Sequence, residues 1–333
     1  MSGLPSWMVE AEAPAVPAAG AEATVEMRVA GREVLAEGVI ALELCPQDGA
    51  EAPAWEPGAH VDLHLPDGAI RQYSLCGDPD DRGSLRVAIL REAEGRGGSR
   101  HLHDETAVGD VLPVGGPRNN FPLEHSPRFA FIAGGIGVTP IVPMIAAARA
   151  RGADWSLLYG GRSRRSMAFL DRLETDPRVR IMPEDEMGLL DLASVLAEVD
   201  PQTAIYCCGP EPLLHAVEAA CAHWHEDALH VERFKARDDL PSGPGTAFTV
   251  VLDKSGIELE IAPGQTILQA VSEAGVPVPS SCEEGTCGTC ETVVLEGEPE
   301  HRDSVLTPAD RARNDCMMIC CSRCRGERLV LDL

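Results

Sequence analysis

Aromatic residues and lysines are scarce in this chain, and basic residues as a whole are outnumbered. Aromatics make up 4% of the 333 residues, and Lys235 and Lys254 are the only lysines. The 28 basic residues face 53 acidic ones, which gives a formal net charge of −25. An acidic surplus of this size excludes a protein that binds nucleic acid or another polyanion, and it favours a partner with a basic surface.

The sequence also shows no signal peptide and no membrane-spanning segment. Residues 1–22 lack the basic start and the apolar core of a secretory signal and carry no periodic pattern. The longest apolar stretch begins at Phe129 and is interrupted by glycines and by Pro140 and Pro143, which favours a strand, a loop and a helix. We therefore expect a cytoplasmic protein with a flexible leader over residues 1–22 and no membrane partner.

Hydrophobic periodicity divides the remaining chain into three predicted domains. Residues 23–127 alternate between apolar and polar in short stretches, which predicts an antiparallel β-barrel. Over 128–236, strand-like stretches alternate with helical ones, as in a parallel α/β sheet. A linker rich in charge, proline and glycine over 237–246 leads to a third domain over 247–333. A strand pair and a short helix precede its cysteine-rich loop.

The stretch SSCEEGTCGTC holds Cys282, Cys287 and Cys290 in a C-x4-C-x2-C spacing. Without an export signal, clustered cysteines indicate metal or redox ligands rather than disulfides. This spacing with a distant fourth cysteine is typical of a plant-type 2Fe-2S cluster, whereas structural zinc usually takes paired C-x2-C motifs. The count of cysteines alone does not choose among the candidates for the fourth ligand, which are Cys316, Cys320, Cys321 and Cys324.

A 2Fe-2S cluster accepts one electron at a time, whereas a hydride donor delivers two. A flavin can connect them, because it accepts a hydride and releases single electrons. The stretch RQYSL is a predicted strand on which Arg71 could grip a phosphate, Tyr73 could lie against the flavin ring and Ser74 could reach a ring nitrogen. Taken alone, this motif is short, and Tyr73 could equally be a structural barrel residue. Further along the chain, Gly97, Gly98 and Ser99 stand just before a helix-like segment. The N–H groups and the dipole at the start of a helix favour a phosphate there.

The stretch AGGIGVTP follows a strand and opens a helix, but it lacks the G-x-G-x-x-G spacing of a dinucleotide-binding fold. Glycines here would let a pyrophosphate or a nicotinamide approach the backbone, and Thr139 could cap the helix or face the flavin. In YCCGPEPLL, Cys207 is expected to be a buried thiol. The choice between NADH and NADPH stays open, because a phosphate clamp or a solvated turn could explain Arg162, Arg164 and Arg165.

Three motifs resemble those of the phthalate dioxygenase reductase family, which includes vanillate O-demethylase reductases. The stretches VPSSCEEGTCGTC, EHRDSVLT and CCSRCRGERLVLDL resemble its ferredoxin domain, and the resemblance extends over about residues 24–333. It implies that the fourth ligand is Cys320, three positions before Arg323. The metal ligands are then Cys282, Cys287, Cys290 and Cys320. The other thiols nearby become ordinary ones, namely Cys316, Cys321 and Cys324.

The resemblance also implies the cofactor contacts. The absence of an adenine-binding insertion favours FMN over FAD, and the family favours NADH, with NADPH possible. The implied FMN contacts are Arg71, Tyr73, Ser74, Ala88, Ile89, Gly97, Gly98 and Ser99. The implied contacts on the nicotinamide side are Gly134, Gly135, Gly137, Thr139, Cys208, Gly209, Pro210 and Phe234. The expected catalytic residues are Ser74, Thr139 and Cys208. One departure is Leu90, which stands where a relative has a lysine.

In function, the resemblance implies the reductase component of a multicomponent oxygenase. This NAD(P)H-dependent oxidoreductase would pass electrons through FMN and a 2Fe-2S cluster to a terminal oxygenase, either Rieske-type or an aromatic O-demethylase. A self-sufficient flavin or quinone reductase and a non-catalytic redox sensor are the alternatives. From Gly245 to Leu333 the chain holds 15 acidic and 7 basic residues, so we expect this domain to dock on a basic surface of the oxygenase.

Overall fold

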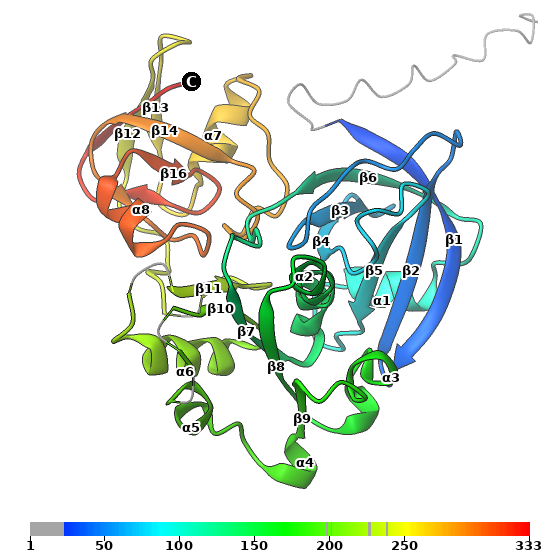
Figure 1. Cartoon of the computed structure of the whole chain (residues 1–333). Coiled ribbons are helices and arrows are strands. Elements are labelled where there is room, and N and C mark those ends of the chain that lie inside the picture. The colour runs from blue at the N-terminus through cyan, green and yellow to red at the C-terminus, as the bar shows by residue number, and fades with distance from the viewer. Residues whose placement is uncertain (1–22, 198, 201, 226–227, 238) are drawn as a thin grey trace, which may run out of the picture.

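The computed structural model describes residues 23–333 apart from 198, 201, 226–227 and 238, so the predicted leader lies outside the described residues. Three large sheets organise the chain, each in its own region of Figure 1. The blue and cyan strands form one, the green strands form the second, and the yellow, orange and red strands form the third.

The first sheet is an antiparallel barrel with the strand order β4-β3-β6-β1-β2-β5. A bridge between Leu75 and Val87 closes it between the end of β4 and β5. Burial alternates in the second half of β2, where Leu42 and Leu44 point into the barrel core while Glu43 faces outward, whereas the first four residues of the strand are all buried. The strands are β1 (Thr24–Ala36), β2 (Val39–Pro46), β3 (His60–His64), β4 (Ile70–Ser74), β5 (Leu85–Leu90) and β6 (Val111–Arg118). A short helix, α1 (Gly98–Asp104), follows β5.

The second sheet is parallel, with the strand order β11-β10-β7-β8-β9. The chain reverses its direction of winding between β7 and β10, so the carboxyl ends of these two strands form the topological switch point, where open α/β sheets bind ligands. Its strands are β7 (Arg128–Gly134), β8 (Asp154–Gly161), β9 (Val179–Pro183), β10 (Ala204–Cys208) and β11 (Leu229–Glu232).

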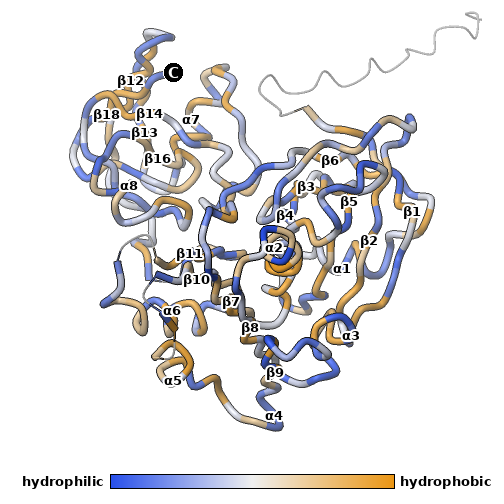
Figure 2. Tube along the Cα trace, viewed as in Figure 1, coloured by the Kyte–Doolittle hydropathy of each residue, from blue (hydrophilic) through white to orange (hydrophobic). Residues whose placement is uncertain are grey.

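Helices cover both faces of this parallel sheet. The apolar helix α2 (Val138–Ala150) is mostly orange in Figure 2 and packs against β7 and β8. On the other face, α5 (Leu192–Ala197) and α6 (Glu211–Cys221) pack together. Shorter elements complete the domain: η1 (Gly135–Gly137), η2 (Arg164–Ser166), α3 (Leu170–Leu173) and α4 (Glu184–Met187).

The third sheet has the strand order β13-β12-β18-β14-β16, and a separate two-stranded sheet pairs β15 with β17. Helix α7 (Ile267–Glu273) begins at a capping box in which Thr266 and Gln269 bond each other's backbone N–H. The remaining elements are β12 (Phe248–Leu252), β13 (Ile257–Ile261), β14 (Glu291–Glu296), β15 (Pro299–Glu300), α8 (Pro308–Arg313), β16 (Cys316–Met318), β17 (Arg323–Cys324) and β18 (Arg328–Leu331).

The hydrophobic cores show how these parts are joined. One core continues from the barrel, with Val39 and Ala88, to the α/β sheet, with Phe131 and Ile141. The third domain has a core of its own. The predicted multidomain class of β-barrel, α/β sheet and α+β ferredoxin domain is confirmed. Within the described part of the chain, no helix has both the length and the apolar character to cross a membrane.

Candidate active site

A cavity of about 450 Å³ lies where the three domains meet. The barrel contributes Arg71, Tyr73, Ser74, Ala88, Gly98 and Ser99 to its wall. The α/β domain contributes Ile136, Thr139, Glu232 and Phe234. The third domain contributes Glu284, Thr286, Ser304 and Val305. One cavity therefore brings together the predicted flavin residues, part of the predicted nicotinamide site and the cysteine-rich loop.

Arg71 and the glycine loop form one end of this cavity. The Arg71 guanidinium donates to the carbonyl oxygens of Ile70 at 2.7 Å and Arg96 at 3.3 Å. A Cβ atom at Gly98 would lie 2.7 Å from Arg71 Cγ and Nε, so only glycine fits there. Gly97 has a φ of 92°, in the left-handed region that favours glycine. The glycine loop thus contacts the Arg71 guanidinium, and guanidinium N–H groups are suitable hydrogen-bond donors for a phosphate.

Two polar atoms in the cavity wall are buried with little hydrogen bonding from the protein. They are His60 Nε2 and Ser74 Oγ, and the neighbour of Ser74 is the carboxyl group of Glu232. Burial lowers the pKa of His60 to about 4, so its ring is neutral. Buried polar groups are normally paired, so these atoms fit a ligand that offers polar atoms along a ring edge. The two predicted flavin contacts on β5 have different environments. Ala88 lines the cavity, whereas the side chain of Ile89 is fully buried in the barrel core.

The glycines after β7 serve chain packing more than ligand approach. A Cβ atom at Gly137 would lie 2.3 Å from the carbonyl oxygen of Cys208, and one at Gly134 would lie 2.7 Å from Pro210 Cδ. The loops after β7 and β10 therefore need glycine to pass each other at the switch point. Gly135 differs, because a Cβ atom there would meet nothing within 4 Å. Among these residues, Gly135 leaves room for a ligand.

Thr139 lies in the cavity wall but does not cap α2. Its Oγ1 donates to the carbonyl oxygen of Ile136 at 3.0 Å, and Gly137 occupies the cap position without a side-chain bond. The capping alternative is therefore wrong, because the hydroxyl is already engaged by the preceding turn. Phe234 also lines the cavity and is 43% exposed. It is held between two ion pairs, Arg233 with Glu211 and Lys235 with Glu92.

Glu232 is a site residue that the sequence analysis missed. It ends β11, lines the cavity and accepts a weak hydrogen bond from Cys208 Sγ at 3.9 Å. Burial raises the pKa of Glu232 to about 8, so its carboxyl group is largely protonated at neutral pH. Burial also raises the pKa of Cys208 well above its ordinary value. The HVERF stretch gave no signal of this role, because β11 is an edge strand of the sheet and a glutamate at its end is unremarkable.

The cysteine loop orients backbone N–H groups toward its own sulfurs. The N–H groups of Glu284 and Thr286 both donate to Cys282 Sγ at 3.4 Å. The N–H of Cys282 donates to Cys287 Sγ at 3.5 Å. Such donors favour thiolates and tune the potential of a cluster that they hold. Gly285 takes a φ of 70° and lies so close to Cys321 that a Cβ atom would be 2.5 Å from its Sγ.

Cys320 lies with the three loop cysteines, and all four are buried. Hydrogen bonds from Cys287 and Cys320 lower the pKa of Cys282, and one from Cys320 lowers the pKa of Cys290. Within the described ranges, no three His, Cys, Asp or Glu side chains surround a point suited to a single metal ion. Cys282 thus neighbours both Cys287 and Cys320, and Cys290 neighbours Cys320, so the four thiols form one connected group of the kind that holds a 2Fe-2S cluster.

The remaining thiols near this loop have other partners. Cys324 Sγ donates to the carbonyl oxygen of Arg328 at 3.5 Å, and Cys321 Sγ donates to that of Met318 at 3.8 Å. Cys316 is buried on β16. In the α/β domain, Cys207 is a fully buried strand thiol.

Comparison with known proteins places these features in a family. The family described as the 2Fe-2S iron-sulfur cluster binding domain matches residues 250–325. The phenoxybenzoate dioxygenase subunit beta of Ectopseudomonas oleovorans is 44% identical over 320 residues, which are 95% of this chain and 99% of that protein. The solved structure of phthalate dioxygenase reductase matches with a TM-score of 0.69 and 37% identity, covering 93% of this chain and 98% of that one. This chain belongs to the phthalate dioxygenase reductase family.

The family membership confirms several predictions. The chain is an oxidoreductase of the oxygenase-reductase type, with a pyridine nucleotide, a flavin and a 2Fe-2S cluster as cofactors. A further solved structure, an intact type IV self-sufficient cytochrome P450 monooxygenase, matches with a TM-score of 0.86 and 46% identity. That match covers 93% of this chain but 41% of the P450 chain, so this chain spans under half of that protein.

Proposed function

We propose that this reductase carries electrons from NADH through FMN in the three-domain cavity to the 2Fe-2S cluster, and from there to a terminal oxygenase. One observation carries the proposal: Ser74, Thr139 and Thr286, each from a different domain, line the same cavity. When bound, a flavin accepts a hydride from a nicotinamide and releases its electrons singly. The proposed domain boundaries are 23–127, 128–236, 237–246 and 247–333.

FMN is the flavin that these residues suit. Arg71 and the Gly97–Ser99 loop would hold its phosphate, Tyr73 and Ala88 would contact the ring, and the buried Ser74 hydroxyl would bond its polar edge. Only six residues separate Leu90 from Gly97, so this connection has no room for an adenine-binding segment. Ile89 would contribute through its backbone alone, because its side chain is in the barrel core.

The α/β domain would hold the nicotinamide against the flavin. The loops of Gly134, Gly135 and Gly137 and of Cys208, Gly209 and Pro210 form the switch point beside Thr139. Glu232 would keep a proton next to Ser74 and Cys208, so that no buried negative charge opposes the arrival of a hydride. Phe234 is exposed enough to move aside when the nicotinamide enters.

NADH is the proposed donor. Arg164 is already paired with Glu174. The N–H of Asp185 in the acidic helix α4 bonds the carbonyl oxygen of Arg162 at 3.2 Å. A 2′-phosphate would therefore approach acidic side chains, whereas acidic residues suit the free ribose hydroxyl of NADH.

Cys282, Cys287, Cys290 and Cys320 are the proposed cluster ligands, and a groove beside Cys320 is the proposed exit to the oxygenase. This groove of about 350 Å³ is lined by Cys320 together with Glu273, Glu283 and polar side chains. None of its lining residues is basic. Together with the acidic surplus of this domain, this supports docking of a basic surface of the oxygenase.

The test is an anaerobic titration with NADH, then with NADPH, followed by visible absorption and electron paramagnetic resonance. We expect loss of flavin absorbance followed by bleaching of the cluster and a rhombic signal. Cys320→Ser should remove that signal and stop reduction of cytochrome c while leaving reduction of ferricyanide, with Cys324→Ser as the matched control. Cytochrome c reduction that survives in Cys320→Ser would instead indicate a self-sufficient flavin reductase, and a flavin that NADH does not reduce would indicate a sensor.

A further inference from the structure

A buried carboxylate of the barrel faces the cluster loop. Asp62 on β3 is 2% exposed. Its Oδ2 accepts a hydrogen bond from Ser281 Oγ at 2.5 Å and lies 2.6 Å from Arg118 Nη2. Gln72 Nε2 donates to Asp62 Oδ1 at 2.9 Å and to Ser281 Oγ at 2.6 Å. Ser281 directly precedes the ligand Cys282, so two barrel side chains hold the start of the loop.

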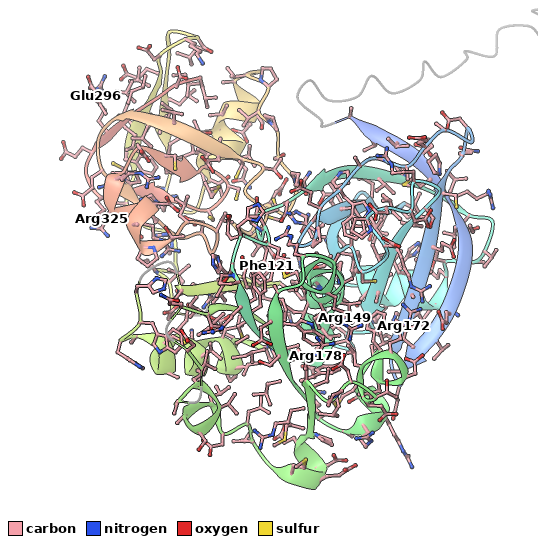
Figure 3. The ribbon with its side chains drawn as sticks, in the orientation of Figure 1. Phe121, Arg149, Arg172, Arg178, Glu296 and Arg325 are labelled. Atoms are coloured by element: carbon pink, nitrogen blue, oxygen red, sulfur yellow. The ribbon has the colours of Figure 1, made fainter. Side chains whose placement is uncertain are left out.

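A second barrel contact reaches a cluster ligand itself. Asn120 Nδ2 donates to the backbone oxygen of Cys287 at 2.7 Å, and Asn120 also lines the flavin cavity. Its neighbours are fixed: Asn119 donates to the carbonyl oxygen of Pro57 at 3.1 Å, and the ring of Phe121 packs at a tilt against that of Tyr206 with centroids 5.3 Å apart. Figure 3 shows Phe121 near the junction of the three domains. Asn120 thus extends from a rigid segment.

These hydrogen bonds are buried or half-buried contacts between the barrel and the cluster loop. Within the described part of the chain the ion pair of Arg96 with Glu284 also joins them, but its side chains are 55% and 38% exposed, so it contributes little. A hydrogen bond to a buried charged group is stronger, and its loss shifts an equilibrium by about 10- to 100-fold. The docked position of the cluster loop thus depends on a few polar side chains.

We propose that Asp62, Gln72 and Asn120 are positioning residues for the passage of an electron from flavin to cluster. They hold Ser281 and Cys287 against the cavity wall and thereby fix the distance over which the electron moves. When both cofactors are bound, the flavin would supply one electron and the cluster would take it up by reduction of one ferric iron to ferrous, and the cluster would pass this electron on before it took up the next. No bond of these residues forms or breaks. This inference rests on the proposed relay. It assigns to the barrel a role in the second half-reaction, beyond holding FMN.

The test uses the full chain loaded with FMN and cluster. In anaerobic stopped-flow with NADH, the flavin of the Ser281→Ala variant should be reduced at the wild-type rate. Its cluster should be reduced about tenfold or more slowly than that of the wild type. Asp62→Ala should act in the same way, Ser281→Thr should restore the rate because it keeps the hydroxyl, and the exposed Ser255→Ala is the matched control. Wild-type cluster reduction in both Ser281→Ala and Asp62→Ala would overturn the proposal.

A second readout is independent of turnover. Amide hydrogen exchange over residues 280–290 should rise about tenfold or more in Ser281→Ala and Asp62→Ala, while the integrated paramagnetic signal after dithionite reduction stays at the wild-type level. Loss of that signal in Asp62→Ala would overturn the proposal in favour of a role in cluster assembly. If NADH fails to reduce the flavin even in the wild type, the proposed relay is wrong, and the exchange experiment still decides whether these side chains hold the loop.

Discussion

The barrel has two interfaces of opposite character. Toward the α/β domain it shares a continuous apolar core, in which Ala88 and Phe131 belong to the same cluster of buried side chains. Toward the ferredoxin domain it presents Asp62, Gln72 and Asn120, and that domain packs around a core of its own. Apolar interfaces of this kind are typical of parts that fold together, and polar ones of parts that can separate. The barrel thus joins the α/β domain across an apolar interface and meets the cluster loop across a polar one.

The largest expected effect comes from breaking the apolar interface. Phe121 is 3% exposed and packs against Tyr206. Phe121→Ala should lower the free energy of unfolding by about 3–5 kcal/mol, because a buried aromatic ring is removed from a packed core. Calorimetry should show the barrel and the α/β domain losing stability together. If only one of two separate transitions moved, the two domains would not share a folding unit.

A smaller, pH-dependent effect should come from Glu232. Its folded pKa of about 8 lies above the ordinary value of about 4.3, so the folded state binds more protons between these values. Stability that depends on the protonated carboxyl is present below about pH 4.3 and is lost as the pH rises toward 8. The slope is at most about 1.4 kcal/mol per pH unit.

Glu232→Gln keeps the side chain neutral and should remove this dependence. The measurement is the difference in melting temperature between the variant and the wild type from pH 5 to 9, which should grow in favour of the variant as the pH rises. The exposed Glu258→Gln on β13 serves as the control. A constant difference across this range would show that Glu232 is already ionised at low pH.

The smallest effect is expected at the rim of the polar interface. Arg96→Gln removes the ion pair with Glu284, and exposed ion pairs contribute about 0.2–1 kcal/mol. Cluster reduction in the stopped-flow assay should therefore slow by less than about fivefold. The difference from the wild type should vanish at high salt, because salt screens exposed charges. A larger loss that persists at high salt would show that the rim, not the buried Asp62 contacts, holds the loop.

The sequence predicts best those features that are local along the chain. The C-x4-C-x2-C loop and the strand of Arg71–Ser74 follow from short motifs, and alternation predicts the barrel class. Strand β6 was not singled out, because its Gly115, Gly116 and Pro117 interrupt the apolar pattern that marks a strand. A strand could therefore be predicted where apolar and polar residues alternate without interruption, and not where glycine and proline break the alternation.

Residues that act through tertiary contact could not be found in this way. Asp62 and Ser281 are 219 positions apart, so nothing near either residue signals their hydrogen bond. Glu232 looks like an ordinary strand-end carboxylate until the fold places it, half-buried, beside Cys208. The glycines after β7 are visible in the sequence, but their reason, the close approach of the β10 loop, is not.

The separate core of the ferredoxin domain has a consequence for a cell that is short of iron. Apart from the cluster ligands, the residues that hold this core together are hydrophobic side chains, and the shared core of the other two domains contains no cluster ligand. Chains made without iron would therefore still assemble the barrel and α/β walls of the cavity, but the wall that the cluster loop supplies would lack its metal anchor. Loss of iron would thus separate the two halves of the reductase: the half that accepts the hydride would keep its folded core, and the half that passes electrons on would be unloaded.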